Sequence, residues 1–238
     1  MNRTGIDWSN TKSNIKLEET LYFYTRNDYL IINNMLNGNM DLVWELANIV
    51  IQDNVGVLKE HYNGERPPFD DKTIAWLKSR CWEKLDEKAR AEIYETAKND
   101  VMNILNAMKP VKENITLYRV IIIDGDNGTR RPYTKSLDYN VGDIIEFKHI
   151  SSTCISLGYE EITGAEEREN YKFYRYEISY PVNGLVLELN PLRHNEENEI
   201  LLPPLKCKIT NIRQDKNNEK CVGIIEMKYI ERLPVIFN

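Results

Sequence analysis

Several features that mark well-known classes of protein are scarce or missing in this 238-residue sequence. It has three histidines, and its four cysteines show no C-x-x-C spacing, which excludes a recognisable zinc site. The cysteines are better interpreted as reduced, mostly buried thiols of an intracellular protein. No apolar run approaches the ~20 residues of a membrane-spanning helix, and the first residues lack the apolar core of a signal peptide. We therefore expect a cytoplasmic protein with no membrane partner and no bound metal.

An excess of positive charge is also missing, because the net charge is −6 and the isoelectric point is about 5.3. No global basic field therefore attracts a nucleic acid. A small basic cluster at Arg130, Arg131 and Lys135 is open to two interpretations, a phosphate contact or an ordinary solvated turn. What the chain does have is the 42% hydrophobic and 29% charged content of a soluble globular protein, in a length that fits one large domain.

Apolar residues at helical spacing dominate the first 112 residues. Asn37 and Gly38 predict the end of the first helix, and Asp71 is suited to cap the third. The strongest helical period runs from Ile93 to Met108. The expected helices span residues 15–36, 40–62, 71–85 and 93–108. The helices between residues 40 and 108 have two possible roles, recognition of an acceptor or partner and completion of the core.

From about residue 113 the sequence changes to β-branched and alternating apolar patterns. The polar residues 155–170 are interpreted as a loop or a short helix. The expected strands span residues 115–123, 141–150, 171–180, 184–190, 199–212 and 222–230. Helices followed by strands predict an α+β fold with a mixed or antiparallel sheet. We expect a single domain over residues 1–238, with a mainly helical part up to 112 and a β-rich part from 113.

Two carboxylates, those of Glu197 and Glu199, stand two positions apart where an apolar run begins. If Glu199 opens a strand, both side chains leave the backbone on the same side, with Glu199 exposed at the strand end. Such a pair is suited to acid–base or electrostatic catalysis. The competing interpretation is an ordinary acidic turn.

Arg119 lies inside an otherwise apolar strand, where burying its charge is costly unless it meets an anion. The alternative is an edge-strand arginine with its head in water. Ser151, Ser152 and Thr153 form a hydroxyl-rich segment that can organise a ribose or hold a carboxylate, or else faces solvent from a strand. Cys154 follows them, but no histidine and acid surround it in the order expected for a nucleophilic cysteine.

Three motifs, in this order, resemble those of the mono-ADP-ribosyltransferases of the arginine–serine–glutamate class: Leu117-Tyr118-Arg119, Ser152-Thr153-Cys154 and Glu197-x-Glu199. That family includes clostridial binary-toxin enzymes, vertebrate ecto-transferases and phage-encoded transferases. Residues 24–36 are similar to the family's N-terminal helix. Cys154 replaces the third serine of the family's Ser-Thr-Ser motif, and Val120 stands where the family often has glycine. A register slip by one residue would make Ser151 the first serine.

The resemblance implies a β-sandwich core of the ADP-ribosyltransferase type and NAD⁺ as the substrate, cleaved at the nicotinamide–ribose bond without a metal. It assigns Glu199 to the ribose hydroxyl and to the positive charge that develops on the ribose, and Glu197 to the acceptor. Arg119 would clamp the pyrophosphate, and Ser152 would order Glu199. Further NAD⁺-binding residues implied by the resemblance are Thr153, Ser151 and Tyr118, with Tyr159, Tyr171 or Phe173 stacking on nicotinamide.

In the family that this sequence resembles, a glutamate at the position of Glu197 goes with arginine acceptors, so the resemblance implies an arginine side chain of a target protein as the acceptor. It also implies an intracellular toxin, effector or phage-type modifier that acts in the producing or the target cell. Three alternatives stay open: a nucleic-acid base as acceptor, water as acceptor in an NAD⁺ glycohydrolase, and a non-catalytic binding module with the same fold. The acidic net charge argues mildly against a nucleic acid. An antitoxin or inhibitor protein is an expected partner in the cell that makes such an enzyme.

Overall fold

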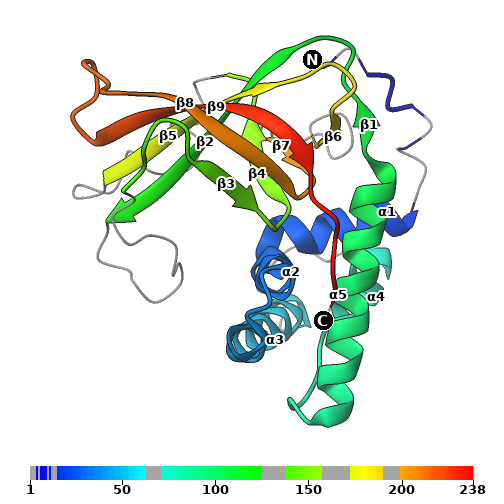
Figure 1. Cartoon of the computed structure of the whole chain (residues 1–238). Coiled ribbons are helices and arrows are strands. Elements are labelled where there is room, and N and C mark those ends of the chain that lie inside the picture. The colour runs from blue at the N-terminus through cyan, green and yellow to red at the C-terminus, as the bar shows by residue number, and fades with distance from the viewer. Residues whose placement is uncertain are drawn as a thin grey trace. The chain divides into compact units, whose positions relative to one another are not determined.

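The chain divides into a helical unit and a β unit, which are described separately. The computed structural model describes residues 4, 6–9, 11, 15–62, 71–124, 138–156, 172–189 and 199–237. The helical unit takes residues 14–107 and 236–238, and the β unit takes residues 1–13 and 108–235 (Figure 1). The chain is therefore an α+β protein with its helices first, as the sequence predicts.

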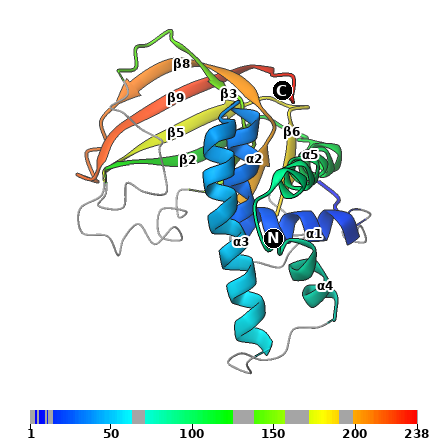
Figure 2. The same cartoon turned by 90° about the horizontal axis from the view of Figure 1, so that it is seen from below.

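The helical unit is built from five α-helices and one π-helical turn in the described residues. They are α1 (Ile15–Phe23), the π-turn η1 (Tyr24–Asp28), α2 (Tyr29–Leu36), α3 (Met40–Tyr62), α4 (Asp71–Ser79) and α5 (Glu87–Ala107). Helix α2 packs against α3, and α1 packs against α5 (Figure 2). Buried residues on α3 include Val43, Leu46 and Val50, so this helix contributes to the core of the unit.

Helix α2 ends as the sequence predicts. Gly38 has φ of +77°, a conformation that favours glycine, and its N–H donates to the carbonyl of Met35 at 3.0 Å. The N–H of Asn39 donates to Asn34 O at 2.9 Å, which completes the turn that closes the helix. Helix α5 begins after Asp86, whose carboxylate accepts the Ala89 N–H at 3.0 Å.

Two of the expected helices are interrupted or shortened in the structure. The expected helix 15–36 is interrupted by the π-turn at Tyr24–Asp28, and the expected helix 71–85 ends at Ser79. After Ser79 the chain forms a tight turn, in which the Arg80 N–H donates to Leu77 O, three residues earlier, at 3.1 Å. Both irregular segments supply a charged residue to one buried cluster, Asp28 from the π-turn and Arg80 from the tightened turn.

The buried charge cluster consists of Asp28, Arg80 and Asp100. Arg80 Nη1 lies 3.3 Å from Asp28 Oδ2 and 2.9 Å from Asp100 Oδ2, and all three side chains are at least 90% buried. Thr20 Oγ1 donates to Asp100 Oδ1 at 2.8 Å, and the Arg80 guanidinium lies 4.6 Å from the centroid of the Phe23 ring. One cation thus serves two carboxylates, so burial raises the pKa of Asp28 to about 6 in spite of Arg80.

The raised pKa of Asp28 predicts a pH-dependent stability. The carboxyl is protonated more readily in the folded chain than in the unfolded one, so its contribution is complete below about pH 4 and is lost as the pH rises through about 6. We expect the free energy of unfolding to fall by up to about 3 kcal/mol between pH 4 and pH 7, relative to Asp28→Asn. Urea denaturation of both proteins across this range measures the difference. Parallel pH profiles would contradict it.

The β unit contains a nine-stranded mixed sheet. Its strands are β1 (Lys109–Pro110), β2 (Ile115–Asp124), β3 (Ile144–Phe147), β4 (Ser151–Cys154), β5 (Lys172–Tyr180), β6 (Leu185–Glu188), β7 (Glu199–Leu202), β8 (Leu205–Arg213) and β9 (Cys221–Arg232). Their order is β1-β6-β7-β4-β2-β5-β9-β8-β3. Strands β5 and β9 are parallel, and the other described pairs are antiparallel, which confirms the predicted mixed sheet.

One expected strand is shorter in the structure and another is divided. The segment 141–150 contains only β3, at the edge beside β8, and the next four residues form the separate strand β4 between β7 and β2, which is not among the expected strands. The segment 199–212 is broken at Pro203 and Pro204, which lack the N–H that a sheet requires. The break lets β7 pair with β4 and β6 while β8 pairs with β3 and β9. The prolines therefore separate the strand that carries Glu199 from the rest of the expected strand.

The turn between β5 and β6 fixes the strand beside β7. Tyr180 is 2% exposed, and its hydroxyl donates to Leu185 O at 2.8 Å. The ring lies so close to Gly184 that an added Cβ there would approach it to 2.4 Å, so glycine is required at this position. Tyr180 thereby holds the start of β6, which pairs with β7 through Leu187 and Leu201.

Candidate functional site

The three motifs singled out in the sequence lie on three adjacent strands. Strand β2 carries Arg119, β4 carries Ser152 and β7 begins at Glu199, and their order in the sheet is β7-β4-β2. Tyr118 is directly opposite Cys154, and Cys154 is directly opposite Glu199. Residues about 35 and 45 positions apart in sequence are thus level with one another in the sheet.

Arg119 is half-buried and bonds directly to the strand that carries the serines. Its Nη1 donates to the carbonyl oxygen of Ser152 at 2.9 Å. Strand β2 pairs with β4 at Tyr118 and Cys154, one residue from this contact. The interpretation of Arg119 as a solvated edge-strand residue is therefore wrong, because β2 is an interior strand of the sheet with neighbours on both sides.

The register also divides the hydroxyl-rich segment between the two faces of the sheet. Because side chains alternate along a strand and directly opposite residues share a face, Ser152 lies on the face of Cys154 and Glu199. Ser151 and Thr153 lie on the other face. Thr153 Oγ1 donates to Ile200 O at 2.8 Å, so its hydroxyl ties β4 to β7. The register thus puts Ser152, and not Ser151, on the face of Glu199.

The hydroxyls of Ser151 and Ser152 are buried, and neither has a hydrogen-bond partner among the residues that the structure describes. Buried hydroxyls are normally paired, because leaving one unsatisfied costs about 1–3 kcal/mol. An unpaired hydroxyl on the face of a buried carboxylate is the feature expected of a site that binds a polar ligand such as a ribose. The Ser152 hydroxyl therefore fits the group that the resemblance implies.

Glu199 is the first residue of β7 and is 8% exposed, so the expectation of an exposed strand-end carboxylate is wrong. Its carbonyl accepts the Leu189 N–H at 3.0 Å. Glu197 lies outside the described residues, as do Tyr159 and Tyr171. Phe173 is 1% exposed and packs with Cys221 and Ile224 in a core cluster, which leaves no ring face for stacking on nicotinamide.

Two residues near Arg119 were not singled out in the sequence. Tyr176 is directly opposite Arg119 on β5, and its hydroxyl lies 2.6 Å from that of Tyr139. His149 precedes β4, and burial together with the charge of Arg119 lowers its pKa to about 3. Burial likewise raises the pKa of Tyr176. Both side chains are therefore neutral at neutral pH, so Arg119 supplies the charge at this place while His149 and Tyr176 supply neutral polar and aromatic surface.

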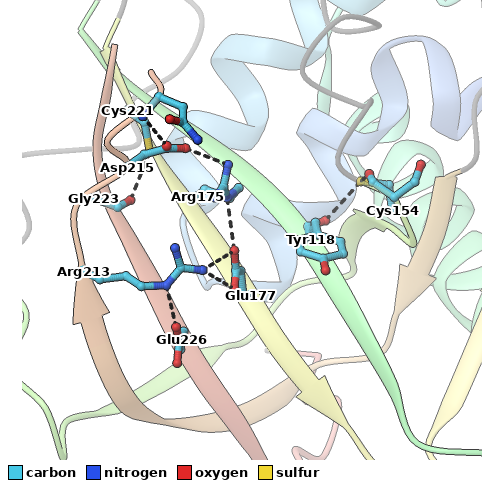
Figure 3. A network of polar contacts seen from close by, with 11 residues as sticks. Tyr118, Cys154, Arg175, Glu177, Arg213, Asp215, Cys221, Gly223 and Glu226 are labelled. Atoms are coloured by element: carbon cyan, nitrogen blue, oxygen red, sulfur yellow. Dashed lines mark hydrogen bonds and ion pairs between the residues drawn. The ribbon is translucent and has the colours of Figure 1, made fainter. Parts of the chain in front are cut away.

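Glu177 on β5 is directly opposite Tyr118, and Glu226 on β9 is directly opposite Glu177. Both glutamates belong to an ion-pair network (Figure 3). Arg175 bonds Glu177 and Asp215 at 3.2 and 3.0 Å, and Arg213 bonds Glu177 and Glu226 at 2.9 and 2.6 Å. Arg213 lowers the pKa of Glu226. These carboxylates have cationic partners and connect β5, β8 and β9, so we interpret the network as bracing of the sheet.

The four cysteines are present as thiols, and three of them are buried: Cys154, Cys207 and Cys221. Cys154 Sγ contacts Ser156 O at 3.0 Å and Tyr118 O at 3.6 Å, as in a small side chain packed between strands (Figure 3). In the described ranges, no three His, Cys, Asp or Glu side chains gather closely enough to bind a metal ion. None of the described helices combines the length and apolar character needed to cross a membrane.

No protein-family model matches the sequence, and no curated protein matches it. Solved structures do match. The catalytic domain of VahC from Aeromonas hydrophila is 15% identical over 91% of this chain and 99% of that one, with a TM-score of 0.52. The Salmonella SpvB ATR domain is 16% identical over 91% and 99%, with a TM-score of 0.51. The ADP-ribosyltransferase Vis, solved in complex with agmatine, is 13% identical over 94% and 78%, with a TM-score of 0.46.

The similarity to these structures concerns the fold. The chain has the fold of the mono-ADP-ribosyltransferases, which confirms at this level the resemblance seen in the three motifs. The chain also covers 99% of the length of the VahC and SpvB domains.

Proposed function

We propose that this chain is an NAD⁺-dependent mono-ADP-ribosyltransferase, which transfers ADP-ribose to an arginine side chain of a target protein. The observation that carries the proposal is the register of β2, β4 and β7. Tyr118, Cys154 and Glu199 are directly opposite one another, so Arg119 and Ser152 lie within two residues of the level of Glu199, which supports the proposal in a chain with the fold of this class of enzyme. An ordinary acidic turn does not account for a buried Glu199 on the same face as an unpaired serine hydroxyl.

The residue types agree with the chemistry of the proposed reaction. Arg119 is suited to a pyrophosphate, because a guanidinium donates two parallel hydrogen bonds to phosphate oxygens. The carboxylate of Glu199 would stabilise the positive charge that develops on the ribose as nicotinamide leaves. Ser152 lies on the same face and would orient Glu199 or a ribose hydroxyl. We propose that β2 and β4, which carry Tyr118, Ser151 and Thr153, form part of the NAD⁺ site, and that these residues contribute to it.

The acceptor we propose is a guanidinium group of a target protein. Glu197 would face the acceptor, and a carboxylate pairs well with a guanidinium, which supports arginine. The net charge of −6 supports a protein rather than a nucleic acid, because a protein that binds phosphates normally needs a basic surface. The enzyme would act in the cytoplasm of the producing or target cell as a toxin, effector or phage-type modifier. An antitoxin or inhibitor would then protect the cell that produces it.

The acceptor class can be identified by labelling a cell lysate. The protein is incubated with lysate and NAD⁺ that carries its label in the adenylate phosphate, and the products are digested with protease or nuclease. If the label is released by protease and not by nuclease, the result supports a protein arginine as the acceptor. Hydroxylamine cleaves ADP-ribosyl-arginine and should then remove the label. Label that nuclease releases would replace arginine by a nucleic-acid base. Free labelled ADP-ribose alone would identify an NAD⁺ glycohydrolase.

Replacing Glu197 should separate transfer from NAD⁺ cleavage. We expect Glu197→Ala to lower transfer to an arginine-containing acceptor about 100-fold, because the group that orients the acceptor is lost. Nicotinamide release in the absence of acceptor should stay within about tenfold of the original, because Glu199 and Ser152 remain. Glu196→Ala is the matched control and should leave both rates unchanged. Equal losses of transfer and cleavage in Glu197→Ala would contradict this assignment.

A further inference from the structure

A segment near the start of the chain is anchored to β6 by a buried carboxylate. We call its described residues, Thr4 and Ile6–Ser9, the N-terminal strap. Thr4, Ile6 and Trp8 are 4%, 4% and 2% exposed. Thr4 Oγ1 donates to Glu188 Oε2 at 2.6 Å, and Trp8 Nε1 donates to the same oxygen at 3.4 Å. Glu188, the last residue of β6, is itself 3% exposed.

The strap has a second anchor on the adjacent strand. Lys109 Nζ donates to the carbonyl of Asp7 at 2.5 Å and lies 4.9 Å from the centroid of the Trp8 ring. Lys109 belongs to β1, where it is directly opposite Val186 of β6. The strap therefore holds both strands at the β1–β6 end of the sheet, and its contacts define the position of Glu188.

Glu188 is one residue from a direct backbone contact with the candidate catalytic strand. It is opposite Ile200 of β7, and the N–H of the following residue, Leu189, donates to Glu199 O at 3.0 Å. The carbonyl of Ile200 in turn accepts the Thr153 hydroxyl. A continuous series of short contacts thus leads from Thr4 through Glu188 and Leu189 to the backbone of Glu199.

A buried carboxylate needs hydrogen-bond donors, and removing one of them is costly because water cannot take its place. The strap supplies two donors to Glu188 from residues more than 175 positions away in sequence. Without them, the end of β6 would shift toward water, and the bond from Leu189 to Glu199 would weaken with it. Small displacements of a charged catalytic group have large effects on rate.

We infer that the N-terminal strap is a positioning element for the active site: Thr4 and Trp8, acting through Glu188, hold the backbone of β7 so that Glu199 is correctly placed. This inference rests on the proposed function of Glu199. A strap that merely adds stability would affect the melting temperature without selectively affecting the rate of the chemical step.

The test replaces the donor of the short hydrogen bond in the full-length chain. Thr4→Val removes the hydroxyl at nearly constant shape, and Thr4→Ser retains it. We expect Thr4→Val to lower kcat for nicotinamide release about tenfold with KM for NAD⁺ within about twofold, because the interaction acts in the transition state. Thr4→Ser, which keeps the hydroxyl, should have a kcat close to that of the wild type. Thr210→Val, which removes an exposed hydroxyl on β8, is the control and should leave both constants unchanged.

A measurement that needs no activity distinguishes failure of the inference from failure of the proposed function. Amide hydrogen exchange at Leu189 and at residues 199–202 should be faster in Thr4→Val and restored in Thr4→Ser, with β8 and β9 unchanged. If the wild type does not cleave NAD⁺, the proposed function fails, and exchange at Leu189 alone decides whether the strap holds β7. Unchanged kcat and unchanged exchange in Thr4→Val would overturn the inference, as would an equal loss of kcat in Thr210→Val.

Discussion

Replacing Glu199 by glutamine should lower the rate of NAD⁺ cleavage by about 10²–10³-fold, the usual loss when one electrostatic contact to a transition state is removed. Glutamine keeps the volume of glutamate at a position that is 8% exposed, but it has no negative charge to stabilise the developing charge on the ribose. The KM for NAD⁺ should change little, because the contact strengthens in the transition state. Nicotinamide release under saturating NAD⁺ measures the effect.

The control for Glu199→Gln is Glu219→Gln, which removes an exposed carboxylate and changes the net charge equally. It should retain full activity. Thermal melting of both variants shows whether they are folded. A folded Glu199→Gln protein that keeps more than about a tenth of the wild-type rate would contradict the role of Glu199, because such a loss is too small for an essential electrostatic group.

The second large effect is expected in the helical unit. Arg80→Met should lower the free energy of unfolding at pH 7 by about 3–5 kcal/mol, because it leaves the buried carboxylates of Asp28 and Asp100 without their cation. The Arg80 side chain is 6% exposed, so water cannot replace the lost partner. Urea denaturation monitored by circular dichroism measures the change.

Two further variants show whether the buried charge causes this loss. The triple variant Asp28→Asn/Arg80→Met/Asp100→Asn removes all three charges and should recover most of the stability, because no unpaired charge remains buried. Lys88→Met removes an exposed cation paired with Glu92 and should change stability by less than about 0.5 kcal/mol. A triple variant no more stable than Arg80→Met would show that packing of Arg80, and not its charge, stabilises the unit.

Local sequence patterns are sufficient to identify the three motifs and most of the helices and strands. Tyr118, Cys154 and Glu199 belong to strands separated by about 35 and 45 residues, and their exact pairing depends on long-range contacts that no local pattern contains. The division at Pro203 and Pro204 is visible in the sequence, because proline is excluded from interior strands. Extending one strand through both prolines is therefore an avoidable error.

Other features have no local signal. Glu188 looks like an ordinary polar residue at the end of a strand, and its burial depends on Thr4 and Trp8, which are distant in sequence. Asp28 interrupts an apolar helical pattern, but its partner Arg80 lies 52 positions later, so the π-turn between α1 and α2 could not be predicted from helical spacing. The sequence pattern places His149 within a strand, but in the structure it lies between β3 and β4 and is buried near the charge of Arg119.

Transfer of ADP-ribose by this chain is measured most directly by following NAD⁺ and its products while the purified, folded protein is incubated with a cell lysate. We expect nicotinamide to appear in step with the loss of NAD⁺, and an equal amount of ADP-ribose to become attached to macromolecules. Glu199→Gln should abolish both under the same conditions. If a protein shown to be folded gives no nicotinamide release and no attached ADP-ribose above the lysate alone, the chain is not an ADP-ribosyltransferase.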